Sequence, residues 1–267
     1  MSTRNILVPH DFTSAGLTAV EYAINLARVF EAEVNLLHIT KDTKQNAKAT
    51  AKFEKIIADL DLKSTDPKVN FIVRKGDIFE TIGNIGKELL SSIIVMGTHG
   101  AKGMQKVFGS FAIKVITSTH IPFIIVQDGN KIFSTKEILF PINSTKESLQ
   151  IEQVVSAIAT KAKSNVHVVS EKYTDSSYKI KSAIHFDIIN KQFAANDISY
   201  RNDNITKMSA PDILKYSKEN NCDLIGISYY SDAIFTQFDR LFQDLITNNS
   251  KYPILIINSK DVGNYFF

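Results

Sequence analysis

The sequence is poor in the residues that cross-link or interrupt a chain. Its 267 residues include one cysteine, Cys222, so no disulfide bond can form within the chain, which fits a reducing compartment. Glycine (11) and proline (6) are scarce, and this excludes a collagen-like or low-complexity chain. Hydrophobic residues make up 44% of the total, so we expect a globular protein of one or two domains.

Long apolar runs and an excess of one charge are absent as well. No stretch of 18 uninterrupted apolar residues occurs, and the run Ile6–His10 is too short for the core of a signal peptide. The 31 basic and 28 acidic residues leave a net charge of +3, which is too balanced to indicate nucleic-acid binding. We therefore expect a cytoplasmic protein that has neither a nucleic acid nor a membrane as its partner.

The chain repeats itself at about half its length. The segment STRNILVP at residues 2–9 returns as STKEILFP at residues 134–141, an offset of 132. Towards the end of each half the offset becomes 131, where it pairs Pro122 with Pro253. Because matches at a near-constant offset run along the whole half, the sequence predicts two copies of one domain-sized unit. We expect domains at 1–128 and 133–258, and a tail at 259–267.

Each copy alternates short β-branched runs with longer helical patterns. In the first helix Leu17, Val20, Ile24 and Ala27 share one face, and Thr13 or Ser14 is the expected N-cap. Such alternation predicts an open five-stranded parallel sheet with helices on both faces, a Rossmann-like three-layer α/β/α fold, in each copy. The expected strands of the first copy are 5–9, 34–40, 69–73, 93–96 and 122–126, and the later helices are 44–60, 77–90 and 109–119.

Glycines cluster after the fourth expected strand of the first copy, where a parallel sheet binds its ligands. Gly97, Gly100 and Gly103 fall within seven residues. Glycine lets main-chain N–H groups approach a ligand, and Gly109-Ser110 at a helix start can bind an anion. Asp11, after the first strand, could accept hydrogen bonds from a ribose. Two simpler explanations remain open, a tight turn for the glycines and a helix cap for Asp11, and the nearby His10 and His99 fit structural or surface roles.

The first copy resembles the universal stress protein family. The resemblance rests on five motifs that cover nearly the whole copy: ILVPHD (6–11), LLHI (36–39), GD (76–77), VMGTHG (95–100) and GS (109–110). It implies an open five-stranded parallel sheet, and many members bind ATP or related adenine nucleotides through a Gly-x2-Gly-x9-Gly-Ser/Thr signature. Here only eight residues separate Gly100 from Gly109, which could displace Gly109 by up to roughly 3.5 Å.

The resemblance also assigns roles to individual residues. Asp11 would hold the ribose, and the adenine pocket would be lined by Pro9, Ile39 and Met96. The glycine signature would hold the phosphates of ATP or AMP, with Mg²⁺ accompanying ATP. Family members commonly dimerise through their last strands. We therefore expect 122–126 to pair with 253–257 as a pseudo-dimer within one chain, and a homodimer is a further option. The implied nucleotide-binding residues are Pro9, Asp11, Ile39, Met96, Gly97, Gly100, Gly109, Ser110 and Phe111.

The second copy has lost the residues of this signature. Asn143 replaces Asp11, Ser228 replaces Gly97, and Ser231 replaces Gly100, while Arg240-Leu241 stands where Gly109-Ser110 was. Side chains now occupy positions that needed bare backbone. We predict that the second copy does not bind ATP in this way and serves as a structural partner, although Arg240 hints at an anion.

Three functions remain open at this point. The leading hypothesis is a stress-response or regulatory module that binds ATP or AMP in its N-terminal domain without efficient catalysis, and whose nucleotide state an unknown protein partner reads. The second is a slow ATPase with His99 as the best candidate for a base. The third is a structural or interaction protein that binds no nucleotide.

Overall fold

The computed structural model describes residues 4–99, 108–229, 237–247 and 250–259. The chain separates into two compact units, unit one (Met1–Lys131) and unit two (Ile132–Phe267). Each is described by itself. None of the helices in the described ranges combines the length and apolar character needed to cross a bilayer.

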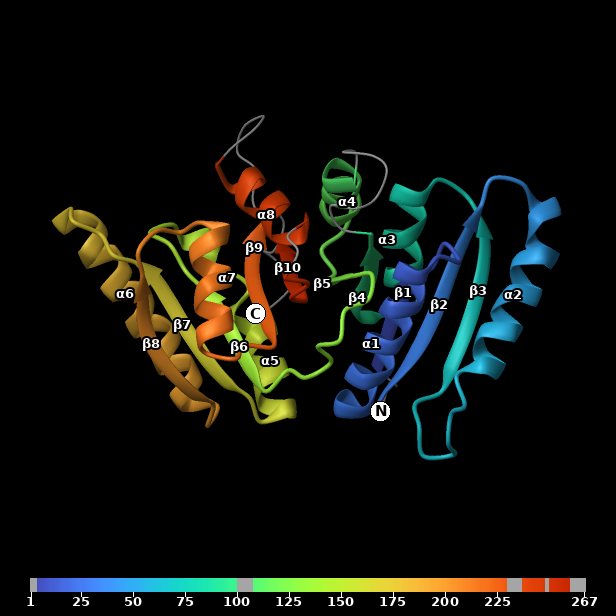
Figure 1. Cartoon of the computed structure of the whole chain (residues 1–267), viewed down its shortest axis with the longest axis horizontal. Coiled ribbons are helices and arrows are strands. Elements are labelled where there is room, and N and C mark those ends of the chain that lie inside the picture. Colours follow the sequence, from blue (N-terminus) through green and yellow to red (C-terminus); the bar gives the residue numbers. More distant parts are fainter. Residues whose placement is uncertain (1–3, 100–107, 230–236, 248–249, 260–267) are drawn as a thin grey trace. The chain divides into compact units, whose positions relative to one another are not determined.

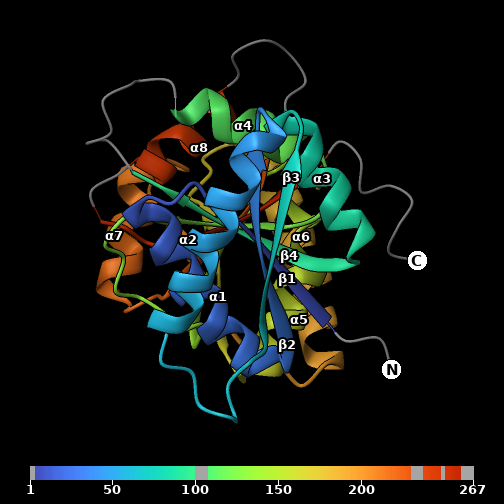
Figure 2. The ribbon, with the colours of Figure 1, turned by 90° about the vertical axis from the view of Figure 1, so that its right-hand side faces the viewer.

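Unit one is an open parallel sheet in the order β3-β2-β1-β4-β5 (Figure 1). Helices α1 and α2 cover one face, and α3 covers the other together with α4, which it contacts (Figure 2). This is the arrangement that right-handed crossovers impose, because the chain reverses its direction across the sheet after β3. The elements are β1 (Arg4–Pro9), α1 (Ser14–Phe30), β2 (Ala32–Thr40), α2 (Asn46–Asp59), β3 (Val69–Lys75), α3 (Ile78–Glu88), β4 (Ser91–Thr98), α4 (Phe108–Thr117) and β5 (Phe123–Gln127).

Unit two repeats this topology, with its parallel strands in the order β10-β9-β6-β7-β8. One difference is a short 3₁₀ helix, η3 (Lys146–Leu149), that precedes its first α-helix. The predicted α/β fold with open parallel sheets is therefore confirmed. The remaining elements are β6 (Glu137–Pro141), α5 (Glu152–Ala162), β7 (Asn165–Glu171), α6 (Ser176–Ala195), β8 (Ser199–Ile205), α7 (Ala210–Glu219), β9 (Leu224–Tyr229), α8 (Gln237–Thr247) and β10 (Ile254–Asn258).

The packing of α1 differs in one detail from the predicted helix face. Val20, Ile24 and Ala27 are buried as expected, but Leu17 is 42% exposed, so its predicted burial is wrong. The buried face is centred on small residues, Gly16 and Ala19 among them, which let the helix lie close to the sheet. Leu17 falls at the edge of that face.

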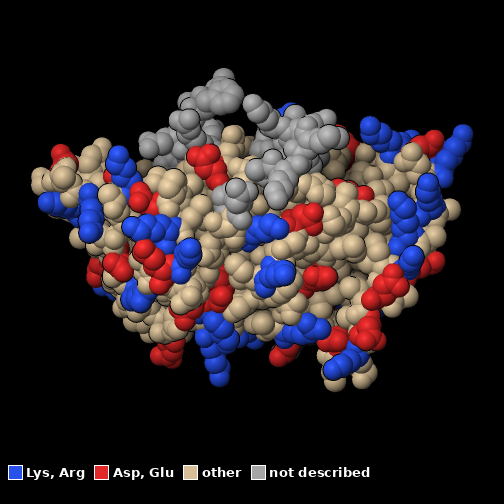
Figure 3. All heavy atoms as spheres, in the orientation of Figure 1, with Lys and Arg blue, Asp and Glu red and all other residues tan. Residues whose placement is uncertain are grey.

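Charged side chains of both signs are interspersed over the surface. On the face shown in Figure 3, Lys and Arg lie among Asp and Glu over most of the described surface, and basic side chains gather at its right-hand edge. The presence of both signs matches the small net charge of the sequence.

Candidate functional site

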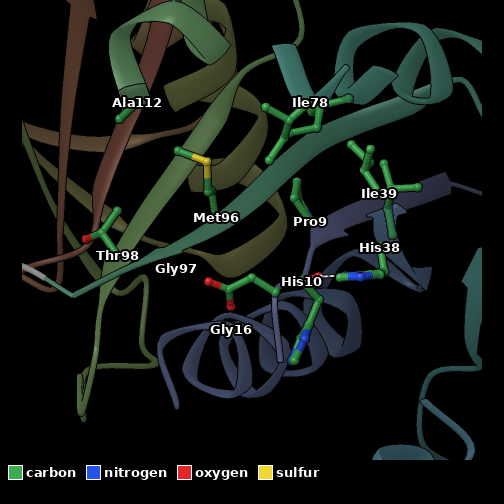
Figure 4. A pocket seen from close by; sticks show the side chains of 13 residues that line it. Pro9, His10, Gly16, His38, Ile39, Ile78, Met96, Gly97, Thr98 and Ala112 are labelled. Atoms are coloured by element: carbon green, nitrogen blue, oxygen red, sulfur yellow. Dashed lines mark hydrogen bonds between the residues drawn. The ribbon is translucent and has the colours of Figure 1, made fainter. Parts of the chain in front are cut away.

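A cavity of about 130 Å³ opens at the carboxyl ends of β1, β2 and β4 in unit one, and we call it the apolar pocket (Figure 4). Five of the nine predicted nucleotide-binding residues line it. This is where an open parallel sheet with reversed strand order binds ligands. The lining residues are Pro9, His10, Asp11, Gly16, Leu37, His38, Ile39, Ile78, Ile82, Met96, Gly97, Thr98 and Ala112.

The walls of the apolar pocket come from the sheet, from α3 and α4 on one face, and from Gly16 of α1 on the other. Pro9, Ile39 and Met96 were predicted to form them. Figure 4 shows Met96 and Pro9 facing the same space as Ile78 of α3. Ile78 and Ala112 were not predicted. They lie on α3 and α4, and tertiary packing decides which helix residues reach the pocket. The only sequence signal for Ile78 is its place just after the cap residue Asp77. Aliphatic walls of this kind can enclose a flat apolar ring.

Asp11 lies at the rim of the pocket and is exposed to solvent. Its Oδ1 accepts hydrogen bonds from the Thr13 main-chain N–H (3.0 Å) and from the Thr13 hydroxyl (2.6 Å). Thr13 in turn caps α1 by accepting from the Gly16 N–H at 3.3 Å. The N-cap is therefore Thr13, as predicted, and Asp11 braces it from outside the helix. The exposed carboxylate can still accept hydrogen bonds from a ligand.

Gly97 is explained by packing inside the unit. A Cβ at this position would lie 2.0 Å from the Ala15 carbonyl oxygen and 3.0 Å from the Gly16 nitrogen. The first turn of α1 thus runs directly against β4, at a distance that no side chain permits. The sequence interpretation attributed this glycine to the approach of a ligand. That reason is not required, because α1 alone excludes a side chain.

The remaining signature residues lie at or near the start of α4. Gly109, Ser110 and Phe111 fall in the first turn of this helix, which begins at Phe108, so the predicted helix start is confirmed for the backbone. Main-chain N–H groups in a first helical turn have no partner within the helix and can bind an anion. Gly100 and Gly103 lie outside the described residues, and so does the effect of the shortened spacing.

His10 lines the pocket, but the hydrogen bonds of its ring and carbonyl hold neighbouring parts of unit one together. Figure 4 shows its ring directed towards Gly16 on α1, away from Met96. Its Nδ1 accepts from the Phe12 N–H at 2.8 Å, and the Nδ1 of His38 donates to the His10 carbonyl at 2.8 Å. Burial lowers the pKa of His10 to about 4, so the ring is neutral at physiological pH.

Groups that could serve catalysis or hold a metal are few in the described ranges. His99 has its Nδ1 3.8 Å from Asp128 Oδ2, which also accepts from the Ser14 hydroxyl at 2.8 Å. No cluster of three His, Cys, Asp or Glu residues that could hold a metal ion occurs in the part of the chain that the structure describes.

Unit two keeps a turn like that of Asp11 and Thr13, but the space next to its Ser228 is much smaller than the apolar pocket. Asn143 Oδ1 accepts from the Thr145 N–H (2.8 Å) and hydroxyl (2.9 Å), as Asp11 does from Thr13. The cavity next to it measures only about 20 Å³ and is lined in part by Ser228, Tyr229 and Phe242. The rings of Tyr229 and Phe242 lie 5.6 Å apart and fill this space. Ser231 lies outside the described residues.

Comparison with known proteins gives consistent results. Residues 2–127 match the model of the universal stress protein family. A universal stress protein of Methanocaldococcus jannaschii is 24% identical over 148 residues, which cover 48% of this chain and 84% of that protein. The crystal structure of a universal stress protein from Archaeoglobus fulgidus has a TM-score of 0.76 at 16% identity and covers 97% of this chain and all of that one. A functionally unknown protein from Pseudomonas aeruginosa has a TM-score of 0.61 at 15% identity, covering 98% and 94% of the two chains.

Proposed function

Because this chain belongs to the universal stress protein family through residues 2–127, we propose that unit one is an adenine-nucleotide-binding module with ATP or AMP as its ligand. The observation that carries the proposal is the apolar pocket, which lies beside the Asp11 carboxylate at the carboxyl edge of the sheet. A purine needs apolar walls, a ribose needs a hydrogen-bond acceptor and phosphates need N–H donors. All three kinds of group belong to this part of unit one.

Each proposed contact follows from the chemistry of the side chain or backbone involved. Pro9, Ile39 and Met96 enclose the adenine, with Gly97 at the edge of the pocket. Asp11 accepts hydrogen bonds from the ribose hydroxyls. Backbone N–H groups at Gly100, Gly109, Ser110 and Phe111 bind the phosphates. Mg²⁺ enters with ATP, held by phosphate oxygens and water as this ion prefers.

We propose that binding is confined to unit one. The space next to Ser228 in unit two is only about 20 Å³ against about 130 Å³ in unit one, and the cavity of about 170 Å³ that adjoins it has the Glu171 carboxylate in its wall instead of an aliphatic side chain. Unit two then acts as a structural partner, and its last strand (254–258) pairs with that of unit one as a pseudo-dimer. The module works in the cytoplasm, where a protein partner reads its nucleotide state.

We propose binding without efficient turnover. The second candidate, a slow ATPase, is favoured by one observation, the proximity of His99 to the Asp128 carboxylate. Phosphate release by the wild-type protein, compared with that of His99→Ala, separates the two. A rate that falls in the variant while ATP affinity is unchanged would make the protein an enzyme.

Asp11→Asn tests the binding proposal. Asn143 shows that an amide oxygen builds the same turn in this chain, so the variant should fold normally. The amide keeps an acceptor but loses the charge, and a hydrogen bond to a charged group contributes about 1 to 1.5 kcal/mol more than one to a neutral group, so ATP affinity should fall about 5-fold to 10-fold in isothermal titration calorimetry. The matched control, Asn143→Asp, should leave affinity unchanged. No binding by the wild-type protein at millimolar ATP with magnesium would refute the proposal.

A further inference from the structure

We propose that unit two has a binding site of its own, for a neutral polyhydroxylated molecule about the size of a monosaccharide. The site is a cavity of about 170 Å³ at the carboxyl ends of β6 and β7, which we call the polar cavity. It adjoins the small space next to Tyr229 and Phe242, with which it shares Asn143, Met208 and Leu241. Its lining residues are Asn143, Ser144, Thr145, Glu171, Tyr173, Met208 and Leu241.

The polar cavity occupies the place in unit two where unit one presents Ile39. Pro9 is opposite Leu37 in unit one, and Pro141 is opposite Val169 in unit two. Two residues further along each strand, Ile39 and Glu171 therefore occupy equivalent positions. A wall that is aliphatic in one unit carries a carboxylate in the other, so the two sites select different chemistry.

The carboxylate of Glu171 is held in place from one side. Its Oε2 accepts a hydrogen bond from the Met208 main-chain N–H at 3.0 Å, which fixes the group between β7 and the segment that leads into α7. A carboxylate has about four acceptor positions, so it keeps capacity for hydroxyl donors of a ligand. Because this carboxylate is already fixed, ligand binding loses less side-chain entropy than it would with a mobile acceptor.

Donors and an apolar surface complete the lining. The Oδ1 of Asn143 is engaged by Thr145, which leaves the amide NH₂ of Asn143 as the group that can donate. Tyr173 stacks on Tyr178 with ring centroids 5.5 Å apart and an interplanar angle of 28°. The Tyr173 hydroxyl hydrogen-bonds with Ser144 and Ser170, and burial, reinforced by the nearby Glu171 charge, raises the pKa of the phenol. Met208 and Leu241 supply the apolar part of the lining.

Charge and size narrow the ligand class. No basic side chain is among the described residues that line the cavity, and Glu171 repels phosphate, so a nucleotide is disfavoured. A volume of 170 Å³ corresponds to five or six water molecules at roughly 30 Å³ each. Vicinal hydroxyls of a neutral polyol can both donate to Glu171 and accept from Asn143.

Ligand-observed saturation-transfer NMR on the full chain, with myo-inositol and D-glucose as probes, tests the site. We expect transfer from the wild-type protein to at least one probe. Glu171→Ile, which installs the unit-one residue, should abolish it. Glu171→Gln keeps an acceptor for the Met208 N–H and should weaken the affinity about tenfold. Circular dichroism establishes that each variant is folded.

Two controls separate this site from nucleotide binding. Asp11→Asn should retain polyol binding while ATP affinity falls, and excess ATP should not displace the polyol. The proposal is wrong if neither probe shows transfer from the wild-type protein at tens of millimolar, if Glu171→Ile leaves the signal unchanged, or if ATP competes. Each of these results is independent of whether unit one binds ATP.

Discussion

Replacing Gly97 with alanine tests whether packing, rather than a ligand, requires a glycine on β4. The added Cβ would lie 2.0 Å from the Ala15 carbonyl oxygen, whereas ordinary contacts begin at 3.4 Å, so the two groups must separate by about 1.4 Å. Neither side can yield easily. Gly97 is paired with Val126 of β5, and Ala15 belongs to the first turn of α1, which packs on four strands.

The cost should be large for a one-carbon change. Overpacking in a core costs typically 1–3 kcal/mol and more where the backbone must shift, so we expect a loss of about 3 kcal/mol from the free energy of unfolding. For a unit of this size that corresponds to a fall in Tm of about 10 °C. Thermal and urea unfolding followed by circular dichroism would measure it without any nucleotide present.

Gly86→Ala is the matched control. Its Cβ would also come close to a neighbour, at 2.6 Å, but that neighbour is the terminal Cδ1 of Ile121, which can rotate away. Alanine also gains about 1 kcal/mol of helix propensity over glycine in α3. The net change should be within about 1 kcal/mol. A Gly97→Ala protein as stable as the wild type, or no less stable than Gly86→Ala, would refute the packing explanation.

Three further predictions concern buried titratable groups. Burial lowers the pKa of His10 to about 4, so the unfolded chain binds the proton more readily than the folded one. The free energy of unfolding of unit one should therefore fall by about 3 kcal/mol as the pH falls from 6.5 to 4. Urea unfolding would measure this loss, and His10→Gln should not show it. In unit two, His167 Nδ1 accepts from Arg201 at 3.0 Å and Nε2 donates to Glu137 at 2.8 Å, while burial lowers the His167 pKa. Unit two should therefore also lose stability below pH 6.5, with the loss reduced in His167→Asn, the residue that unit one carries at this position. Burial raises the pKa of the Cys222 thiol to about 12, so it should react with a thiol reagent only on unfolding, as a colorimetric assay would show.

The fold could be predicted well because both copies obey the same local rules. The expected strand 34–40 is β2 (Ala32–Thr40), and the expected helix 44–60 contains α2 (Asn46–Asp59). In the second copy, α6 is not marked by a simple periodic pattern, because it is apolar on two sides. Ile189 and Phe193 face the core, whereas Ile184 is 52% exposed, so no single apolar stripe marks the helix.

The site was predictable only where a strand end fixes a residue. Pro9, Ile39 and Met96, which the family resemblance assigns to the pocket, lie at predicted strand ends, and they line one cavity. Ile78 and Ala112 reach the same cavity from helices, whose rotation and tilt depend on contacts far away in sequence. The reason for Gly97 was also out of reach, because the close approach of α1 is a tertiary distance.

Asp11 and Asn143 build equivalent turns, and this bears on how the sequences of the two halves could diverge. It needs one side-chain oxygen at its first position, and a carboxylate or an amide supplies that oxygen equally well. After a duplication, one copy can therefore exchange an ionised group for a neutral one and still fold along the same path. Chemistry at the sheet edge is free to diverge while the scaffold beneath it is inherited intact.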